Sequence, residues 1–281
     1  MKLGITTNVF ASQIKKNEIT LEGVLNLASE IGMKSVEIRD DLCTLMLDEV
    51  RKLKEKADAK GLSLSYAIRT EMLATGDRAL FEKGVLSASA CGGRRVLRAM
   101  ASQDALKVEG KKGYIREELD RLVKISNEYG EFAAKHQVLV AIEHAREPLF
   151  GDGRTYFGMS DLLERVEAGN VGLTFDPANA TNVSLCKASS TVGDVLRFVD
   201  MHLKRVFLVH YKTTKGGKGE PTIGDADIDH HMLFERLKRG YDHVVCIEIP
   251  GTESLDLTRK NLRASLNYMK EKNLMGYFQK P

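Results

Sequence analysis

Four short apolar segments in the second half of the chain each end in an acidic residue or a histidine. The segments are VLVAIE, VGLTFD, RVFLVH and HVVCIE, and their last residues are Glu143, Asp176, His210 and Glu248. Successive members are roughly 35 residues apart, the length of one strand, one helix and two loops. Polar residues that end successive buried strands are expected to meet at the carboxyl end of a parallel barrel, where they can hold a shared ligand.

The same alternation of strand and helix extends over the whole chain. The pattern predicts strands at 3–7, 35–40, 62–69, 95–100, 138–143, 171–176, 205–212 and 243–250. Helices are expected near 21–31, 45–60, 78–90, 116–136, 192–202, 231–239 and 257–272, with another beginning behind Ser160 as its N-cap. Eight such units predict an α/β protein, a single (β/α)8 TIM barrel over residues 1–281. An open doubly wound sheet is the alternative, but TTNVFAS after the first strand is no Gly-rich phosphate turn.

Charge and hydropathy exclude several classes of protein. The formal net charge is only +3, which gives no reason to expect a nucleic-acid surface. No apolar run approaches the roughly 18 residues that a membrane span needs, so no membrane partner is expected. The opening KLGITT looks like a strand and predicts no signal peptide, which makes a cytoplasmic location the default. The four cysteines show no CxxC spacing and are expected to be reduced.

The residue types at the four strand ends favour a metal site. Two glutamates, one aspartate and one histidine form an oxygen-rich donor set with one imidazole. Such a set suits a divalent metal such as Mn²⁺, Mg²⁺ or Co²⁺, with Zn²⁺ possible, whereas structural zinc prefers thiolates. A single glutamate at a strand end is usually solvated or ion-paired. Three carboxylates at one barrel mouth would repel one another without a cation, which favours the metal.

Several of these segments resemble a known family. VAIEHA, LTFDPANA, FLVHYK, GDADID and VCIEIPG are similar to segments of the xylose isomerase-like sugar (phosphate) isomerases and epimerases, a superfamily that includes endonuclease IV. The resemblance implies that Glu143, Asp176, His210 and Glu248 are metal ligands. In the ketose 3-epimerase branch it also implies that Glu143 and Glu248 are the catalytic acid/base pair. It further implies a homo-oligomer, a dimer or a tetramer.

The chain departs from the family pattern at positions that handle substrate. Asn179 stands where the epimerase branch usually has a histidine, and Gly216 stands where it has an arginine. We therefore expect Asn179 to contact the substrate in a different way. The extra histidines of the endonuclease IV zinc site are replaced by Arg69, Arg98 and Asn179, so a nucleic-acid substrate is not expected.

Three strands of the first half end near an arginine, which suggests an anionic substrate. Arg39, Arg69 and Arg98 are expected to face the mouth, and Lys212 follows His210 by two residues on the same strand face. Guanidinium groups suit phosphate or carboxylate oxygens, so a sugar phosphate or sugar acid is a candidate substrate. Glu37 shares the inward phase of Arg39 and is expected to hold that arginine or a substrate hydroxyl. Pairing of the arginines with neighbouring carboxylates is the plainer alternative.

Together these features predict a metal-dependent isomerase or epimerase that acts on a small carbohydrate, possibly anionic. The shared step is proton transfer next to a carbonyl group. A lyase with the same barrel is the first alternative, in which a leaving group departs after the proton is removed. A non-catalytic barrel that binds metal or carbohydrate is the second, although carboxylates stand at both acid/base positions, Glu143 and Glu248.

Overall fold

The computed structural model describes residues 1–40, 45–68, 77–101, 106, 110–183 and 190–278, so the predicted site residue Arg69 lies outside the described residues. Eight parallel strands form a closed barrel in the order β1-β10-β7-β6-β5-β4-β3-β2. Their bounds are β1 Lys2–Thr6, β2 Ser35–Arg39, β3 Ser63–Ala67, β4 Val96–Met100, β5 Leu139–Glu143, β6 Val171–Phe175, β7 Val206–Tyr211 and β10 Val244–Ile247. The predicted (β/α)8 barrel is confirmed, and the open doubly wound alternative is excluded.

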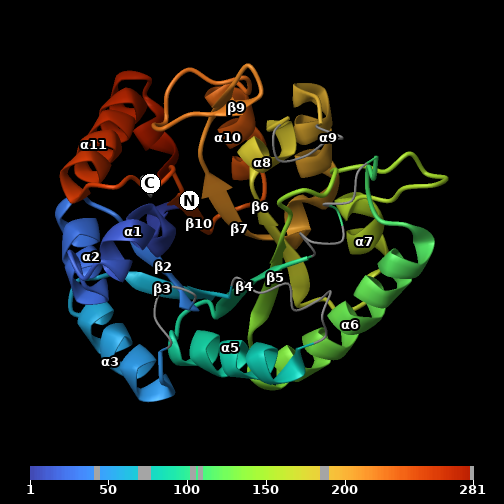
Figure 1. Ribbon diagram of the computed structural model, residues 1–281, viewed down its shortest axis with the longest axis horizontal. Helices are drawn as coiled ribbons and strands as arrows, with labels where there is room; N and C mark the ends of the chain where they lie inside the picture. Colours follow the sequence, from blue (N-terminus) through green and yellow to red (C-terminus); the bar gives the residue numbers. More distant parts are fainter. Residues whose placement is uncertain (41–44, 69–76, 102–105, 107–109, 184–189, 279–281) are drawn as a thin grey trace.

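Helices surround the barrel on its outer side (Figure 1). The main ones are α2 Leu21–Glu30, α3 Leu47–Asp58, α5 Arg78–Ala90, α6 Arg116–Lys135, α7 Met159–Arg165, α9 Val192–His202, α10 His230–Lys238 and α11 Leu255–Glu271. Shorter elements are α1 Ala11–Lys15, α8 Pro177–Thr181, the 3-10 turns Thr7–Phe10, Leu203–Arg205 and Leu274–Phe278, and the hairpin of β8 Thr214–Lys215 and β9 Lys218–Gly219. None of the helices in the described part of the chain is long and apolar enough to cross a membrane.

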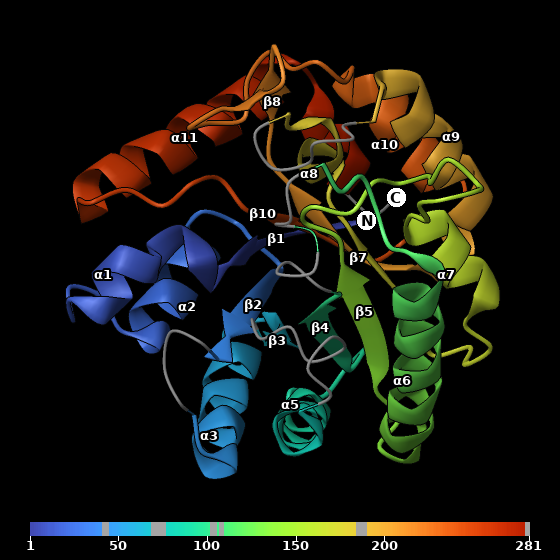
Figure 2. The same ribbon diagram turned by 45° about the vertical axis from the view of Figure 1, so that its right-hand side comes forward.

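The helices form where apolar residues recur at helical spacing, and in α6 and α7 a carboxylate in the first turn, Glu118 or Asp161, accepts the backbone N–H of the cap residue. In α6, which packs against β5 in Figure 2, the buried positions include Leu119, Leu122, Ser126 and Ala133. The prediction that Ser160 caps its helix was wrong. The cap is Gly158, because the Asp161 carboxylate accepts its N–H at 2.8 Å and Ser160 lies inside α7.

The interior of the barrel is filled unevenly. One side is apolar, where Val96, Ala141, Phe207, Leu208 and Cys246 form a cluster separate from the larger core between the strands and the helices. The β-bulge between β6 and β7 and the absence of a side chain at Gly172 make room for the ring of Phe207. A Cβ at Gly172 would lie 2.2 Å from the Arg205 carbonyl oxygen and 2.7 Å from that ring. The β1–β3 side of the interior carries Gly4, Ser35, Ser63 and Ser65 instead.

Candidate metal centre

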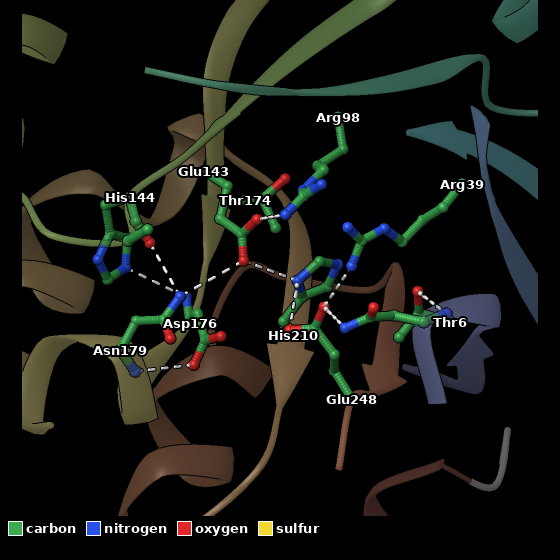
Figure 3. Close-up of polar contacts among 12 residues, drawn as sticks. Thr6, Arg39, Arg98, Glu143, His144, Thr174, Asp176, Asn179, His210 and Glu248 are labelled. Atoms are coloured by element: carbon green, nitrogen blue, oxygen red, sulfur yellow. Dashed lines mark hydrogen bonds and ion pairs between the residues drawn. The ribbon is translucent and has the colours of Figure 1, made fainter. Parts of the chain in front are cut away.

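The four polar residues that end the apolar segments lie together at the carboxyl end of the barrel (Figure 3). Glu143 is the last residue of β5, His210 lies in β7, and Asp176 and Glu248 directly follow β6 and β10. One ligand atom from each lies within 4.8 Å of the others, and all four side chains are buried. The parallel strand order explains this convergence, because every strand delivers its carboxyl end to the same mouth.

His210 lies at the centre of the cluster with a carboxylate on each side of its ring. Nδ1 is 3.0 Å from Glu143 Oε1 and 3.2 Å from Glu248 Oε2, and Nε2 is 3.0 Å from Glu37 Oε2. Burial opposes protonation of His210, but Glu37 and Glu248 outweigh it and raise the pKa to about 10. The same ion pairing holds the pKa of Glu37 below its usual value despite its complete burial. The neighbouring carboxylates therefore favour the protonated form of His210.

Asp176 is held in place by the short helix that it caps. Its Oδ1 accepts hydrogen bonds from the backbone N–H groups of Ala178 and Asn179, each at 3.0 Å. Pro177 begins the helix and fixes the chain direction. The second oxygen, Oδ2, lies 2.7 Å from the Lys212 ammonium and forms an ion pair with it. One oxygen thus orients the carboxylate and the other faces the cluster.

Three of the four cations predicted to bind substrate contact the cluster carboxylates. Lys212 Nζ lies 2.9 Å from Glu248 Oε2, Arg39 lies 3.8 Å from Glu248 Oε1, and Arg98 is hydrogen-bonded to Glu143. Figure 3 shows Arg39 and Arg98 approaching from the same side of His210. Burial opposes ionisation of Glu248, but Lys212 and then His210 hold its pKa well below the usual value.

Further polar side chains support the cluster. Asn179 Nδ2 donates to the His144 carbonyl oxygen at 3.0 Å and lies 3.5 Å from Glu143 Oε1. The ring of His144 accepts the backbone N–H of Asp176 through Nε2 at 3.3 Å, and burial lowers its pKa, as suits a neutral acceptor. Sequence reasoning missed Asn8, which donates to Glu248 Oε1 at 3.2 Å. Asn8 follows the predicted first strand, and this position alone could have placed it at the carboxyl end of the barrel.

The donor set fits a divalent cation. Three buried carboxylates and one imidazole are the ligand types that Mn²⁺, Mg²⁺ or Co²⁺ bind in proteins. Glu37 is placed to fix the tautomer of a neutral His210, because a proton on Nε2 would point at its carboxylate. That leaves the Nδ1 lone pair facing Glu143 and Glu248, the arrangement of a carboxylate–histidine–metal triad. The sequence suggested that Glu37 would hold Arg39 or a substrate hydroxyl. In the structure its carboxylate contacts the far side of the His210 ring instead.

Comparisons with known proteins agree with this architecture. Solved structures similar to the chain include D-psicose 3-epimerase from Clostridium cellulolyticum H10, with a TM-score of 0.69 and 15% identity over 96% of this chain and 99% of that one. A structure of L-ribulose 3-epimerase has a TM-score of 0.69 and 17% identity, over 100% of this chain and 99% of that one. The 3-keto-D-glucoside 4-epimerase from E. coli has a TM-score of 0.68 and 15% identity, over 96% of this chain and 99% of that one. At these identities the likeness shows the fold alone.

Curated protein sequences gave no match. A family model described as xylose isomerase-like TIM barrel matches residues 25–272, which is most of the chain. The chain therefore belongs to the xylose isomerase-like TIM barrel family.

Proposed function

We propose that the protein is a metal-dependent sugar isomerase or epimerase that moves a proton next to the carbonyl of a ketose, a sugar phosphate or a sugar acid. One observation carries the proposal. Glu143 and Glu248, on strands separated in the barrel by β6 and β7, both reach Nδ1 of His210 in one buried cluster. The structural neighbours named as ketose and keto-sugar epimerases support it.

Glu143, Asp176, His210 and Glu248 would hold the metal, which would polarise sugar oxygens and stabilise the negative charge that forms on them. The two glutamates supply the proton chemistry. One carboxylate removes a proton from the carbon next to the carbonyl, and the electron pair of the broken C–H bond moves toward the carbonyl oxygen. The other carboxylate, on a different wall of the mouth, returns a proton to the carbon skeleton, and the carbonyl re-forms.

The cations around the cluster favour an anionic substrate. Arg39, Arg98 and Lys212 now neutralise the carboxylates that would face the metal. A bound divalent ion supplies that positive charge itself, which releases these side chains for a phosphate or carboxylate of the substrate. Asn179 carries no charge, so the three cations and not this amide would bind the substrate anion. A homo-oligomer, either a dimer or a tetramer, remains part of the proposal.

Hydrogen exchange at carbon tests the proposal. The protein is incubated with Mn²⁺ in D₂O with a panel of ketoses, ketose phosphates and keto acids, and the products are analysed by NMR. We expect deuterium next to the carbonyl with wild type, and its loss in Glu143→Gln and Glu248→Gln but not in the exposed control Glu253→Gln. A conjugated product that absorbs in the ultraviolet would instead identify a lyase. Metal-dependent sugar binding without exchange or elimination would identify a binding barrel.

A further inference from the structure

A hollow of about 300 Å³ opens at the amino end of the barrel, opposite the metal centre. We call it the amino-end cavity. Its lining includes Ser35, Ser63, Ser65, Arg94, Phe207 and Val244. Branched side chains usually fill a TIM barrel interior in layers. Here the serines of β2 and β3 are too small to meet the apolar cluster on the other side, and the cavity lies between them.

The inner end of the cavity carries a polar atom without a partner. The Ser65 hydroxyl is buried, its residue is 5% exposed, and it makes no hydrogen bond in the described structure. The other two serine hydroxyls donate to backbone carbonyls, Ser35 to Ser63 and Ser63 to Lys34, each at 3.1 Å. A buried hydroxyl without a partner is costly, so a polar ligand or water in the cavity would stabilise this residue.

The rim of the cavity is positively charged. Lys2 and Arg94 line it, and Lys2 is shared with an adjoining hollow of about 470 Å³ that Lys34 and Lys54 also line. Lys54 is paired with Asp58 on the same helix. Lys2, Lys34 and Arg94 have no carboxylate within ion-pair distance among the residues that the structure describes.

Arg94 is held with its charge near the cavity. Its NH1 donates to the Phe207 carbonyl oxygen at 3.2 Å, and the guanidinium lies 5.5 Å from the centroid of the Phe207 ring. The lining also includes one acidic residue, Asp242, whose carboxylate lies 2.9 Å from His243 Nδ1. Burial, and then the charge of Arg94, lowers the pKa of His243 to about 4, so this ring is a neutral neighbour of Arg94.

We propose that the amino-end cavity binds a small phosphorylated organic molecule. The phosphate lies between Lys2 and Arg94, and the carbon skeleton enters toward Phe207, Val244 and the Ser65 hydroxyl. A volume of about 300 Å³ is at the small end of ligand pockets, which limits the occupant to a compound about the size of a triose phosphate. This site lies at the end of the barrel away from the metal centre and does not depend on the proposed catalysis.

Calorimetric titration of the full-length protein with glycerol 3-phosphate, inorganic phosphate and glycerol tests the proposal. We expect saturable binding of glycerol 3-phosphate, at least tenfold weaker in Lys2→Gln and in Arg94→Gln. Lys260→Gln on α11 serves as the control and should bind as wild type does, and Arg39→Gln reports whether the anion occupies the metal centre instead. Lys2 is exposed, so its substitution tests the site even if Arg94→Gln fails to fold.

Three results would overturn the assignment. The first is an absence of saturable binding to wild type. The second is an affinity that falls in Arg39→Gln but not in Lys2→Gln, since that would place the anion at the metal centre. The third is equal affinity for inorganic phosphate and glycerol 3-phosphate, since an organic ligand must gain affinity from its carbon skeleton.

Discussion

Replacing Lys212 by methionine should tighten metal binding while weakening the metal-free fold. The ammonium lies 2.7 Å from Asp176 Oδ2 and 2.9 Å from Glu248 Oε2, the carboxylates proposed to hold the ion. Both carboxylates are buried and the lysine side chain is only 21% exposed, so solvent screens these contacts weakly. A metal ion would therefore compete with the ammonium for these oxygens, and Lys212→Met removes that competition.

The magnitude follows from Coulomb's law. Two unit charges of the same sign that lie 4 Å apart repel each other by about 4 kcal/mol at an effective dielectric constant of about 20. The repulsion energy between the ammonium and a divalent ion would be twice as large. Movement of the lysine on metal binding recovers most of this cost, so we expect a net gain of about 1.4–2.8 kcal/mol, or about 10–100-fold in the Mn²⁺ dissociation constant. Removing one partner of a buried ion pair costs about 3–5 kcal/mol, which lowers the metal-free melting temperature by roughly 5–15 °C.

Titration calorimetry with Mn²⁺ and thermal unfolding with and without the metal measure both effects. Lys212→Arg keeps the charge and should bind Mn²⁺ much as wild type does. Lys215→Met changes the exposed lysine that ends β8 and should alter neither measurement. Weaker Mn²⁺ binding by Lys212→Met than by wild type would refute the reasoning, because the ammonium would then support the ion instead of competing with it.

Asp176→Asn should keep the cap of α8 through its remaining oxygen but place an NH₂ group toward Lys212, so Mn²⁺ affinity should fall at least tenfold with little loss of helix content by circular dichroism. Burial lowers the pKa of His230, so the unfolded chain binds more protons below about pH 6.5 and stability is lost as pH falls; His230→Gln should flatten that slope in urea unfolding. Gly172→Ala would place a Cβ 2.2 Å from the Arg205 carbonyl oxygen and should lower the melting temperature by several degrees; an unchanged value would contradict the tight packing of the barrel interior.

The barrel was predictable because its signals are local. A buried parallel strand needs a short apolar run, its helix needs a period near 3.6, and both are visible in one sequence. The convergence of Glu143, Asp176, His210 and Glu248 then follows from topology, since successive parallel strands deliver their carboxyl ends to one mouth. The exact hydrogen-bond register between neighbouring strands was not needed to predict that these four side chains meet.

The partners of individual side chains were not predictable in the same way. Glu37 and His210 meet across the barrel from β2 and β7, which are not neighbours in the sheet, so no local pattern marks the pair. Ser160 has the residue type of a helix cap, but it lies inside α7. Its hydroxyl is 2.8 Å from Nε2 of His202 in α9, and no local pattern reveals this tertiary contact. Arg98 faces the mouth as predicted, yet its partner there is Glu143.

These cross-barrel contacts explain how a site with so many carboxylates remains folded without a bound ion. Protonated His210, Lys212 and Arg98 neutralise Glu37, Glu143 and Glu248, so the unloaded cluster carries its own counter-charges. A divalent ion would displace a proton from His210 and the side chains of Lys212 and Arg98 from their carboxylates. Metal binding would then free these cations for a substrate, which links the proposed metal to the proposed preference for an anionic sugar.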